Sequence, residues 1–86
     1  DDYGNNLNNE FQDNCFIHDI DFIYGVVQNL PDKDRLYFTL RYDIFTCKIQ
    51  RTYKAVSELM CVSEETARKE VRRITKDVVS AIHRFE

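Results

Sequence analysis

The chain has 86 residues, of which 43% are apolar and 31% are charged, enough for one small domain with a single modest core. It contains only two glycines and one proline, which favours helices with short connections over a sheet-rich fold. No stretch approaches the roughly 18 apolar residues of a membrane span. The P-loop, nucleophile-elbow and zinc-protease motifs are all absent, so nothing indicates an enzyme, a cofactor or a metal site.

The net charge of −3 hides an uneven distribution. Residues 1–34 carry eight acidic residues and one lysine, and residues 35–86 carry eleven basic and seven acidic residues. The front of the chain is therefore acidic and the back is basic. A nucleic-acid-binding surface is expected in the basic part.

The three cysteines, Cys15, Cys47 and Cys61, are odd in number, and no two have CxxC spacing. A disulfide framework or a zinc site is therefore not expected. Three reduced thiols in a cytoplasmic protein are expected instead. Cys61 is expected to be buried as a small hydrophobic residue.

Residues 1–14 are rich in Asn and Asp and are expected to be a disordered lead-in or linker, so the folded domain is assigned to residues 15–86. A first helix is predicted over residues 15–30, with an apolar stripe at helical spacing: Phe16, Ile20, Ile23, Val27 and Leu30. Pro31 suits the first turn of a second helix, over about residues 31–42. Residues 43–51 have no clear period and are expected to form a connection that places Ile44 and Phe45 in the core.

Thr52 is placed to cap a third helix over residues 53–60. Its predicted inner face consists of Val56, Leu59 and Met60. Cys61 and Val62 form a turn, and Ser63 caps a fourth helix that extends to about His83. The buried stripe of this last helix is Ala67, Val71, Ile74, Val78 and Ile82, and the exposed positions between them carry Arg68, Lys69, Arg72, Arg73 and Lys76.

The last two helices have the features of a helix-turn-helix motif. Small residues, Ser57 and Ala67, lie where the two helices should touch, and Val62 after the turn can fill the space between them. Cys61 takes the place of the usual glycine, so a non-glycine residue must adopt the turn conformation. The predicted fold is thus all-α: a small four-helix domain with a C-terminal helix-turn-helix. The plainer alternative is a helical bundle whose last helix has a solvated basic face.

Two segments carry a family resemblance. Residues 30–42 (LPDKDRLYFTLRY) are similar to the opening of region 4 of sigma-70-type RNA polymerase sigma factors, and residues 52–74 (TYKAVSELMCVSEETARKEVRRI) continue the similarity. The resemblance covers about residues 17–79. The second segment alone also resembles the helix-turn-helix of LuxR/NarL-type response regulators.

The sigma resemblance implies a domain that recognises double-stranded promoter DNA in transcription initiation. The start of the last helix is expected to read the −35 element in the major groove with Glu64, Glu65, Arg68 and Lys69. Among these, Glu65 can accept a hydrogen bond from a cytosine amine, and Arg68 can engage a guanine edge. DNA phosphates are expected at Thr52, Arg72, Arg73 and Lys76. The RNA polymerase core is expected to bind through its β-flap at Phe22, Tyr24, Leu36, Phe38 and Phe45.

Two alternatives remain open at this point. A LuxR/NarL-type regulator would dimerise through the end of the last helix, at Val78, Val79 and Ile82, and would not bind the flap. A sigma-like interaction module that no longer binds DNA would instead bind an anti-sigma factor or polymerase alone. The acidic front half of the chain, and Glu64 at a position where the family often has Arg, favour this last alternative slightly, and promoter recognition stays the leading hypothesis.

Overall fold

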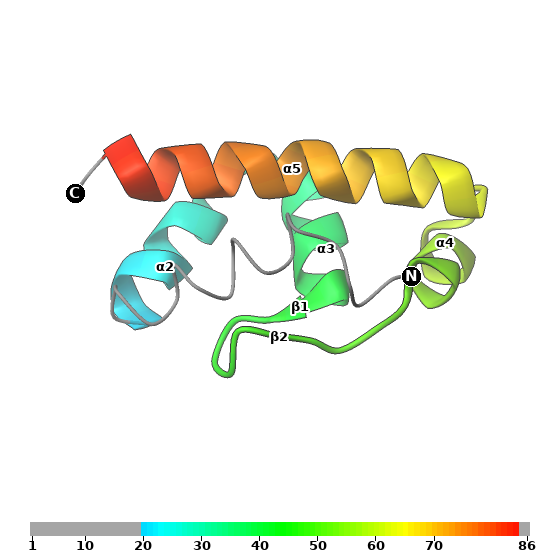
Figure 1. The fold of residues 1–86 in the computed structure, drawn as a ribbon, viewed down its shortest axis with the longest axis horizontal. Coiled ribbons are helices and arrows are strands. Elements are labelled where there is room, and N and C mark those ends of the chain that lie inside the picture. Colours follow the sequence, from blue (N-terminus) through cyan, green and yellow to red (C-terminus); the bar gives the residue numbers. More distant parts are fainter. Residues whose placement is uncertain (1–19, 85–86) are drawn as a thin grey trace.

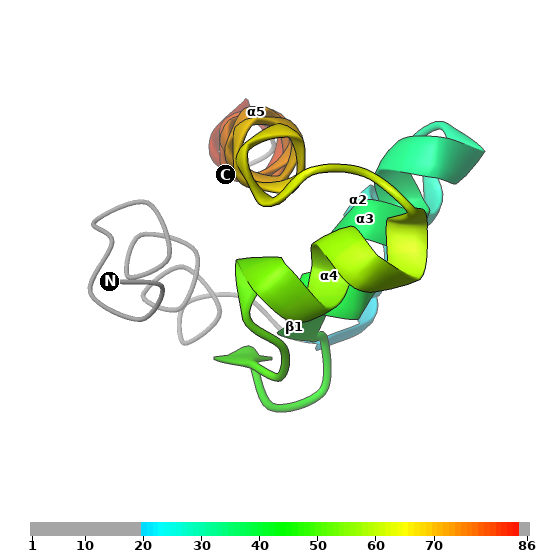
Figure 2. The ribbon, with the colours of Figure 1, turned by 90° about the vertical axis from the view of Figure 1, so that its right-hand side faces the viewer.

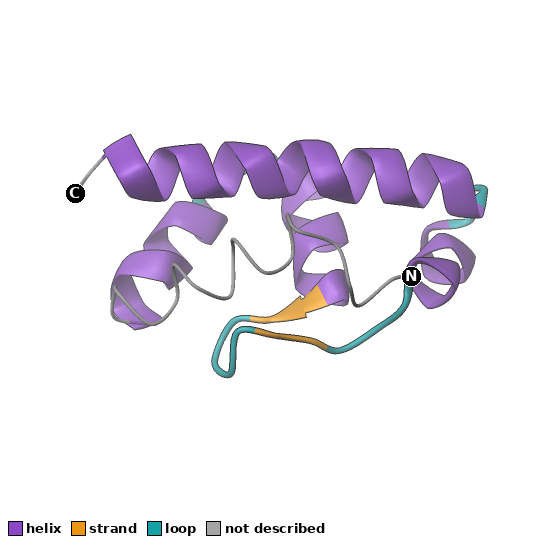
Figure 3. Ribbon diagram, in the orientation of Figure 1, coloured by secondary structure: helices purple, strands orange, loops and turns teal. Residues whose placement is uncertain are grey.

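The computed structural model describes residues 20–84. Over this stretch the elements in chain order are the helices α2 (Ile20–Gln28) and α3 (Asp32–Arg41), the strands β1 (Tyr42–Asp43) and β2 (Lys48–Ile49), and the helices α4 (Tyr53–Met60) and α5 (Glu64–Arg84). The long helix α5 runs along one side, and α2, α3 and α4 all pack against it (Figure 1). The described part is thus a small, mostly helical domain (Figure 3). The lead-in assigned to residues 1–14, the start of the first predicted helix and Phe16 lie outside the described residues.

The core is built on α5. All five residues of its predicted stripe are fully buried, which confirms the helical period of this segment. The core residues that the other elements contribute are Ile23, Val27, Tyr37, Phe38, Tyr42, Ile44, Tyr53 and Val56. Because a 21-residue helix is about 30 Å long, it offers one apolar face to three shorter helices at once.

The ends of α4 and α5 are as the sequence predicts. Thr52 Oγ1 accepts a hydrogen bond from Ala55 N–H at 3.2 Å and caps α4. Cys61 adopts the left-handed conformation (φ 59°, ψ 43°) at the end of α4, and Val62 N–H donates to the Ser57 carbonyl at 3.0 Å, as in a Schellman cap. Ser63 Oγ accepts from Thr66 N–H at 3.1 Å at the start of α5. The two helices are therefore joined by a three-residue turn with a cap on each side.

The connection between α3 and α4 differs from the prediction, because it contains a β-hairpin. Tyr42 is extended (φ −118°, ψ 141°) and ends α3, and it pairs with Ile49 across the two strands. The Asp43 carboxylate accepts a hydrogen bond from Phe45 N–H at 2.9 Å and stabilises the turn. Ile44 is buried as predicted, but Phe45 is 70% exposed. The prediction that both residues enter the core is therefore wrong for Phe45, which the turn directs away from the helices.

The chain that follows β2 also donates hydrogen bonds to the last carbonyls of α3. Gln50 Nε2 donates to the Thr39 carbonyl at 2.6 Å, Gln50 N–H donates to the Arg41 carbonyl at 2.9 Å, and Arg51 Nη1 donates to the Leu40 carbonyl at 3.1 Å. These last-turn carbonyls have no partner inside the helix. The segment 42–51 thus acts as the C-terminal cap of α3.

Other local predictions need correction. Pro31 lies at the N-cap of α3 rather than in its first turn, with its carbonyl accepting from Arg35 N–H at 2.8 Å. Leu59 is 57% exposed, since α4 turns only one side to the core. Cys61 is free and exposed because it lies in the turn, outside both packed faces.

Cys47 takes part in a disulfide, and its partner lies outside the described residues. The expectation of three reduced thiols is therefore wrong, because spacing along the chain does not reveal which cysteines the fold brings together. Disulfides are uncommon in the reducing cytosol, so the cysteines no longer support a cytoplasmic location. None of the helices between residues 20 and 84 has both the length and the apolar content to cross a membrane.

Candidate nucleic-acid interface

The candidate interface is formed by α4, the turn and the first half of α5. Figure 2, which looks along α5, shows α4 running across the view beside the first turns of α5, so the two helices cross steeply. Close approach needs small side chains, and Ser57 of α4 and Ala67 of α5 are both buried. Val62 is half-buried against the core. This packing leaves the outer side of the first turns of α5 open to solvent.

The four predicted base-reading residues lie together on the first two turns of α5. Each basic residue faces a carboxylate one turn earlier: Arg68 Nη2 is 3.9 Å from Glu64 Oε2, and Lys69 Nζ is 3.5 Å from Glu65 Oε1. The side chains are between 41% and 74% exposed. Pairs this exposed contribute little to stability, so a competing partner can separate them at small cost.

The four residues predicted to contact phosphate are placed in three different ways. Arg72 and Lys76 continue the four-residue spacing of the base-reading candidate Arg68, and the three form a ridge along one side of α5. Arg72 and Lys76 are exposed, and neither forms an ion pair with another residue of the stretch 20–84. Thr52 is half-buried, and its hydroxyl is engaged in capping α4.

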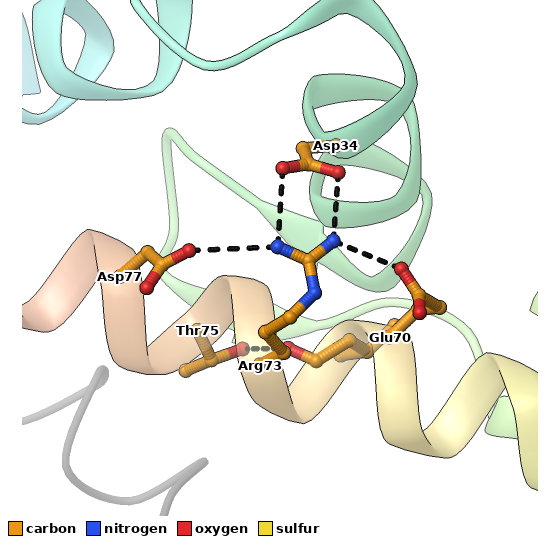
Figure 4. Close-up of polar contacts among 6 residues, drawn as sticks. Asp34, Glu70, Arg73, Thr75 and Asp77 are labelled. Carbon is orange, nitrogen blue, oxygen red and sulfur yellow. Dashed lines mark hydrogen bonds and ion pairs between the residues drawn. The ribbon is translucent and has the colours of Figure 1, made fainter.

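Arg73 is placed differently from the ridge, on the side of α5 that faces α3 (Figure 4). Its guanidinium donates to both Asp34 oxygens, at 2.9 and 3.4 Å, and to Glu70 Oε2 at 2.9 Å, and it lies 3.6 Å from Asp77 Oδ2. The hydrogen bonds that Arg73 donates to Asp34 and, second, to Glu70 raise the pKa of Arg73 above its ordinary value. Its charge is thus already balanced by three carboxylates, and it ties α5 to α3.

A buried polar cluster lies behind the interface, where α3, α4 and α5 meet. Arg41 is fully buried, and its guanidinium lies 3.9 Å from the ring centroid of Tyr53 and donates to the Arg51 carbonyl at 2.9 Å. Burial raises the pKa of Tyr42, and its side-chain hydrogen bonding with Thr75 and then the charge of Arg41 oppose this rise. The Thr75 hydroxyl donates to the Val71 carbonyl at 2.7 Å. Sequence reasoning missed this cluster, because its only signal was an Arg–Tyr pair at the end of a predicted helix.

The five residues assigned to polymerase binding do not all reach the surface. Phe38 is fully buried in the core and is not part of any surface in this structure, which corrects its assignment. Phe22 is half-buried, while Tyr24, Leu36 and Phe45 are 47%, 48% and 70% exposed. The exposed three come from α2, α3 and the hairpin, respectively. Leu36 lines an open groove of about 360 Å³ beside Gln28 and Thr39.

Comparison with family models, with curated proteins and with solved structures finds no match to the chain. Among residues 20–84, no group of three or more potential metal ligands is present either. The case for a function therefore rests on the residues and their arrangement.

Proposed function

We propose that this chain is a promoter-binding domain similar to sigma factor region 4, in which α4 and α5 form a helix-turn-helix and α5 enters the major groove. The observation that carries the proposal is the join between the two helices. A left-handed Cys61, a capping Ser63 and the buried pair Ser57 and Ala67 hold the helices at a steep crossing. This arrangement leaves the N-terminal turns of α5 free to approach base edges.

The proposed role of each residue follows from the exposure and the ion pairs of its side chain. Glu64, Glu65, Arg68 and Lys69 read bases, and Arg72 and Lys76 hold phosphates. Arg73 leaves the phosphate set, because Asp34, Glu70 and Asp77 already neutralise it. Tyr24, Leu36 and Phe45 remain the candidates for contact with the β-flap of RNA polymerase.

Duplex binding tests the first half of the proposal. The purified chain is titrated into a random-sequence duplex and into duplexes selected from a random pool, with fluorescence anisotropy as the readout at several salt concentrations. Arg72→Ala should weaken binding to every sequence and reduce the salt slope by about 1. Arg68→Ala should remove about 1–3 kcal/mol of discrimination at one base pair.

Lys48→Ala is the matched control, since it removes one exposed positive charge from the hairpin, on the side of α3 away from α5 (Figure 1). It should leave affinity and salt slope unchanged. If Arg72→Ala behaves like Lys48→Ala, the groove assignment is wrong.

Binding to the isolated β-flap, measured by calorimetry, separates the sigma-like function from the LuxR/NarL-type regulator and from the interaction module that does not bind DNA. A LuxR/NarL-type regulator binds DNA but not the flap. Its predicted dimer contacts, Val78, Val79 and Ile82, are at most 5% exposed within the domain, which counts against that alternative. Flap or anti-sigma binding without duplex binding would favour the interaction module that has lost DNA binding.

A further inference from the structure

The ring of Tyr53, at the first position of α4, contacts two guanidinium groups. The Arg41 carbon Cζ lies 3.9 Å from the ring centroid, and the Arg68 Cζ lies 5.4 Å from it. Tyr53 is 2% exposed and Arg41 is fully buried, whereas the Arg68 side chain is 41% exposed. The three residues thus connect the end of α3, the start of α4 and the candidate reading surface of α5.

The contact is of a kind that restrains an arginine without neutralising it. A cation within about 6 Å of an aromatic centroid is attracted to the ring. An arginine guanidinium that stacks on the ring face keeps its N–H donors available for other partners. A carboxylate partner, in contrast, competes for the same donors that a base would use. The Glu64 carboxylate approaches Arg68 only to 3.9 Å, so the ring is the contact that survives when Glu64 turns away.

The position of the ring is itself well determined. Tyr53 begins α4 directly after the capping residue Thr52, and the Arg41 guanidinium packs closely against the ring. A side chain held in this way has little rotamer freedom to lose on binding. Lys69, the other basic residue of the reading set, is 74% exposed and is paired only with Glu65 among the described residues.

We propose that Tyr53 is a positioning residue for base recognition, which holds the Arg68 guanidinium ready for the edge of one guanine. The inference rests on the proposed DNA-binding function and deepens it. It assigns the sharpest sequence preference to the base pair that Arg68 meets, and a weaker preference to the one that Lys69 meets. Tyr53 acts through Arg68 and does not contact the DNA.

The test compares Tyr53→Leu, which removes the ring, with Tyr53→Phe, which keeps it. Selected duplexes and their single-base variants are titrated with the full chain, after denaturation curves confirm that each variant is folded. Tyr53→Leu should lower discrimination at the Arg68 base pair by about two- to five-fold, the range of a partly exposed cation–π contact. Discrimination at other positions and the salt slope should be unchanged, and Tyr53→Phe should behave like the original chain.

A double-mutant cycle shows whether the effect passes through Arg68. In an Arg68→Ala background, Tyr53→Leu should cause no further loss of discrimination. Equal losses with and without Arg68, or a loss spread evenly over all base pairs, would mean that Tyr53 serves only the fold, and would overturn the inference.

A direct measurement covers the case in which Tyr53→Leu does not fold. The δ-methylene protons of Arg68 should be shifted by the Tyr53 ring current in the NMR spectrum of the original chain, and the shift should persist in Tyr53→Phe. Unshifted protons would show that the contact does not exist. If the original chain binds no duplex at all, the proposed function fails together with this inference. Duplex binding that depends on Arg72 but not on Tyr53 would overturn the inference alone.

Discussion

Replacing Arg73 by alanine should weaken the domain more than any other change of a surface charge on α5. The guanidinium joins α5 to Asp34 on α3 through two hydrogen bonds, and Asp34 is only 15% exposed. The loss also leaves Asp34, Glu70 and Asp77 close together with no cation between them (Figure 4). Removal of Arg73 therefore costs an attraction and creates a repulsion.

The magnitude follows from the exposure of the groups. Hydrogen bonds to charged groups contribute about 1.5–3 kcal/mol, and the 48% exposure of Arg73 reduces this to roughly half through solvent screening. The pairs with Glu70 and Asp77 lie within one helix and add about 0.3–0.5 kcal/mol each. We therefore expect Arg73→Ala to lower the free energy of unfolding by about 2 kcal/mol.

Urea denaturation followed by circular dichroism at neutral pH measures this loss, and Arg72→Ala is the control on the neighbouring position. Arg72→Ala should change stability by less than about 0.5 kcal/mol. A cycle with Asp34→Asn should give a coupling energy of about 1 kcal/mol, which falls at high salt. Equal effects of Arg72→Ala and Arg73→Ala, or no coupling to Asp34, would refute the reasoning. For DNA binding the order of the two variants should be reversed: Arg72→Ala should change the salt slope more than Arg73→Ala does.

Three further outcomes are expected from denaturation curves. Ile74→Ala should cost about 2–4 kcal/mol because it opens a cavity in the centre of the core, while Leu59→Ala, at a position 57% exposed, should cost far less; similar losses would contradict the described packing. Cys61→Gly should stabilise the chain by about 0.5–1 kcal/mol, since glycine adopts the left-handed turn without strain; a loss of stability would argue against this turn. Burial raises the pKa of Tyr42 above its ordinary value of 10.0, so the neutral phenol of Tyr42 stabilises the fold fully below pH 10, and this contribution is lost as the pH rises through the folded-state pKa. Tyr42→Phe should therefore reduce the loss of unfolding free energy at alkaline pH. An unchanged dependence of stability on pH would refute the burial of an ionisable Tyr42.

Local sequence signals were sufficient for the caps of α4 and α5 and for the long helix. Ser63 and Thr52 form their predicted caps because a cap involves only the next three residues. The stripe from Ala67 to Ile82 predicts a buried face because helical period alone decides which side chains share a side. Cys61 takes the left-handed conformation at the expected position. The base-reading candidates could be placed on the first turns of α5 for the same reason.

The sequence did not predict the hairpin, because its strands have two residues each and no period can be read from them. It also did not separate Arg72 from Arg73, which are adjacent in the chain and both exposed to some degree. Only the packing of α3 against α5 brings Asp34 to Arg73, 39 residues away, and leaves Arg72 to the solvent. The roles of two neighbouring cations are thus set by a long-range contact.

The amino-acid sequence by itself determined where the helices lie, how α4 and α5 are joined and which face of α5 is apolar, since each of these depends on interactions within a few residues. The tertiary structure alone decided which charges remain available to a partner, that Phe38 is core and Phe45 is surface, and that Tyr53 lies between Arg41 and Arg68. These outcomes depend on how helices pack across the domain, and burial and charge pairing between distant segments are properties of that packing.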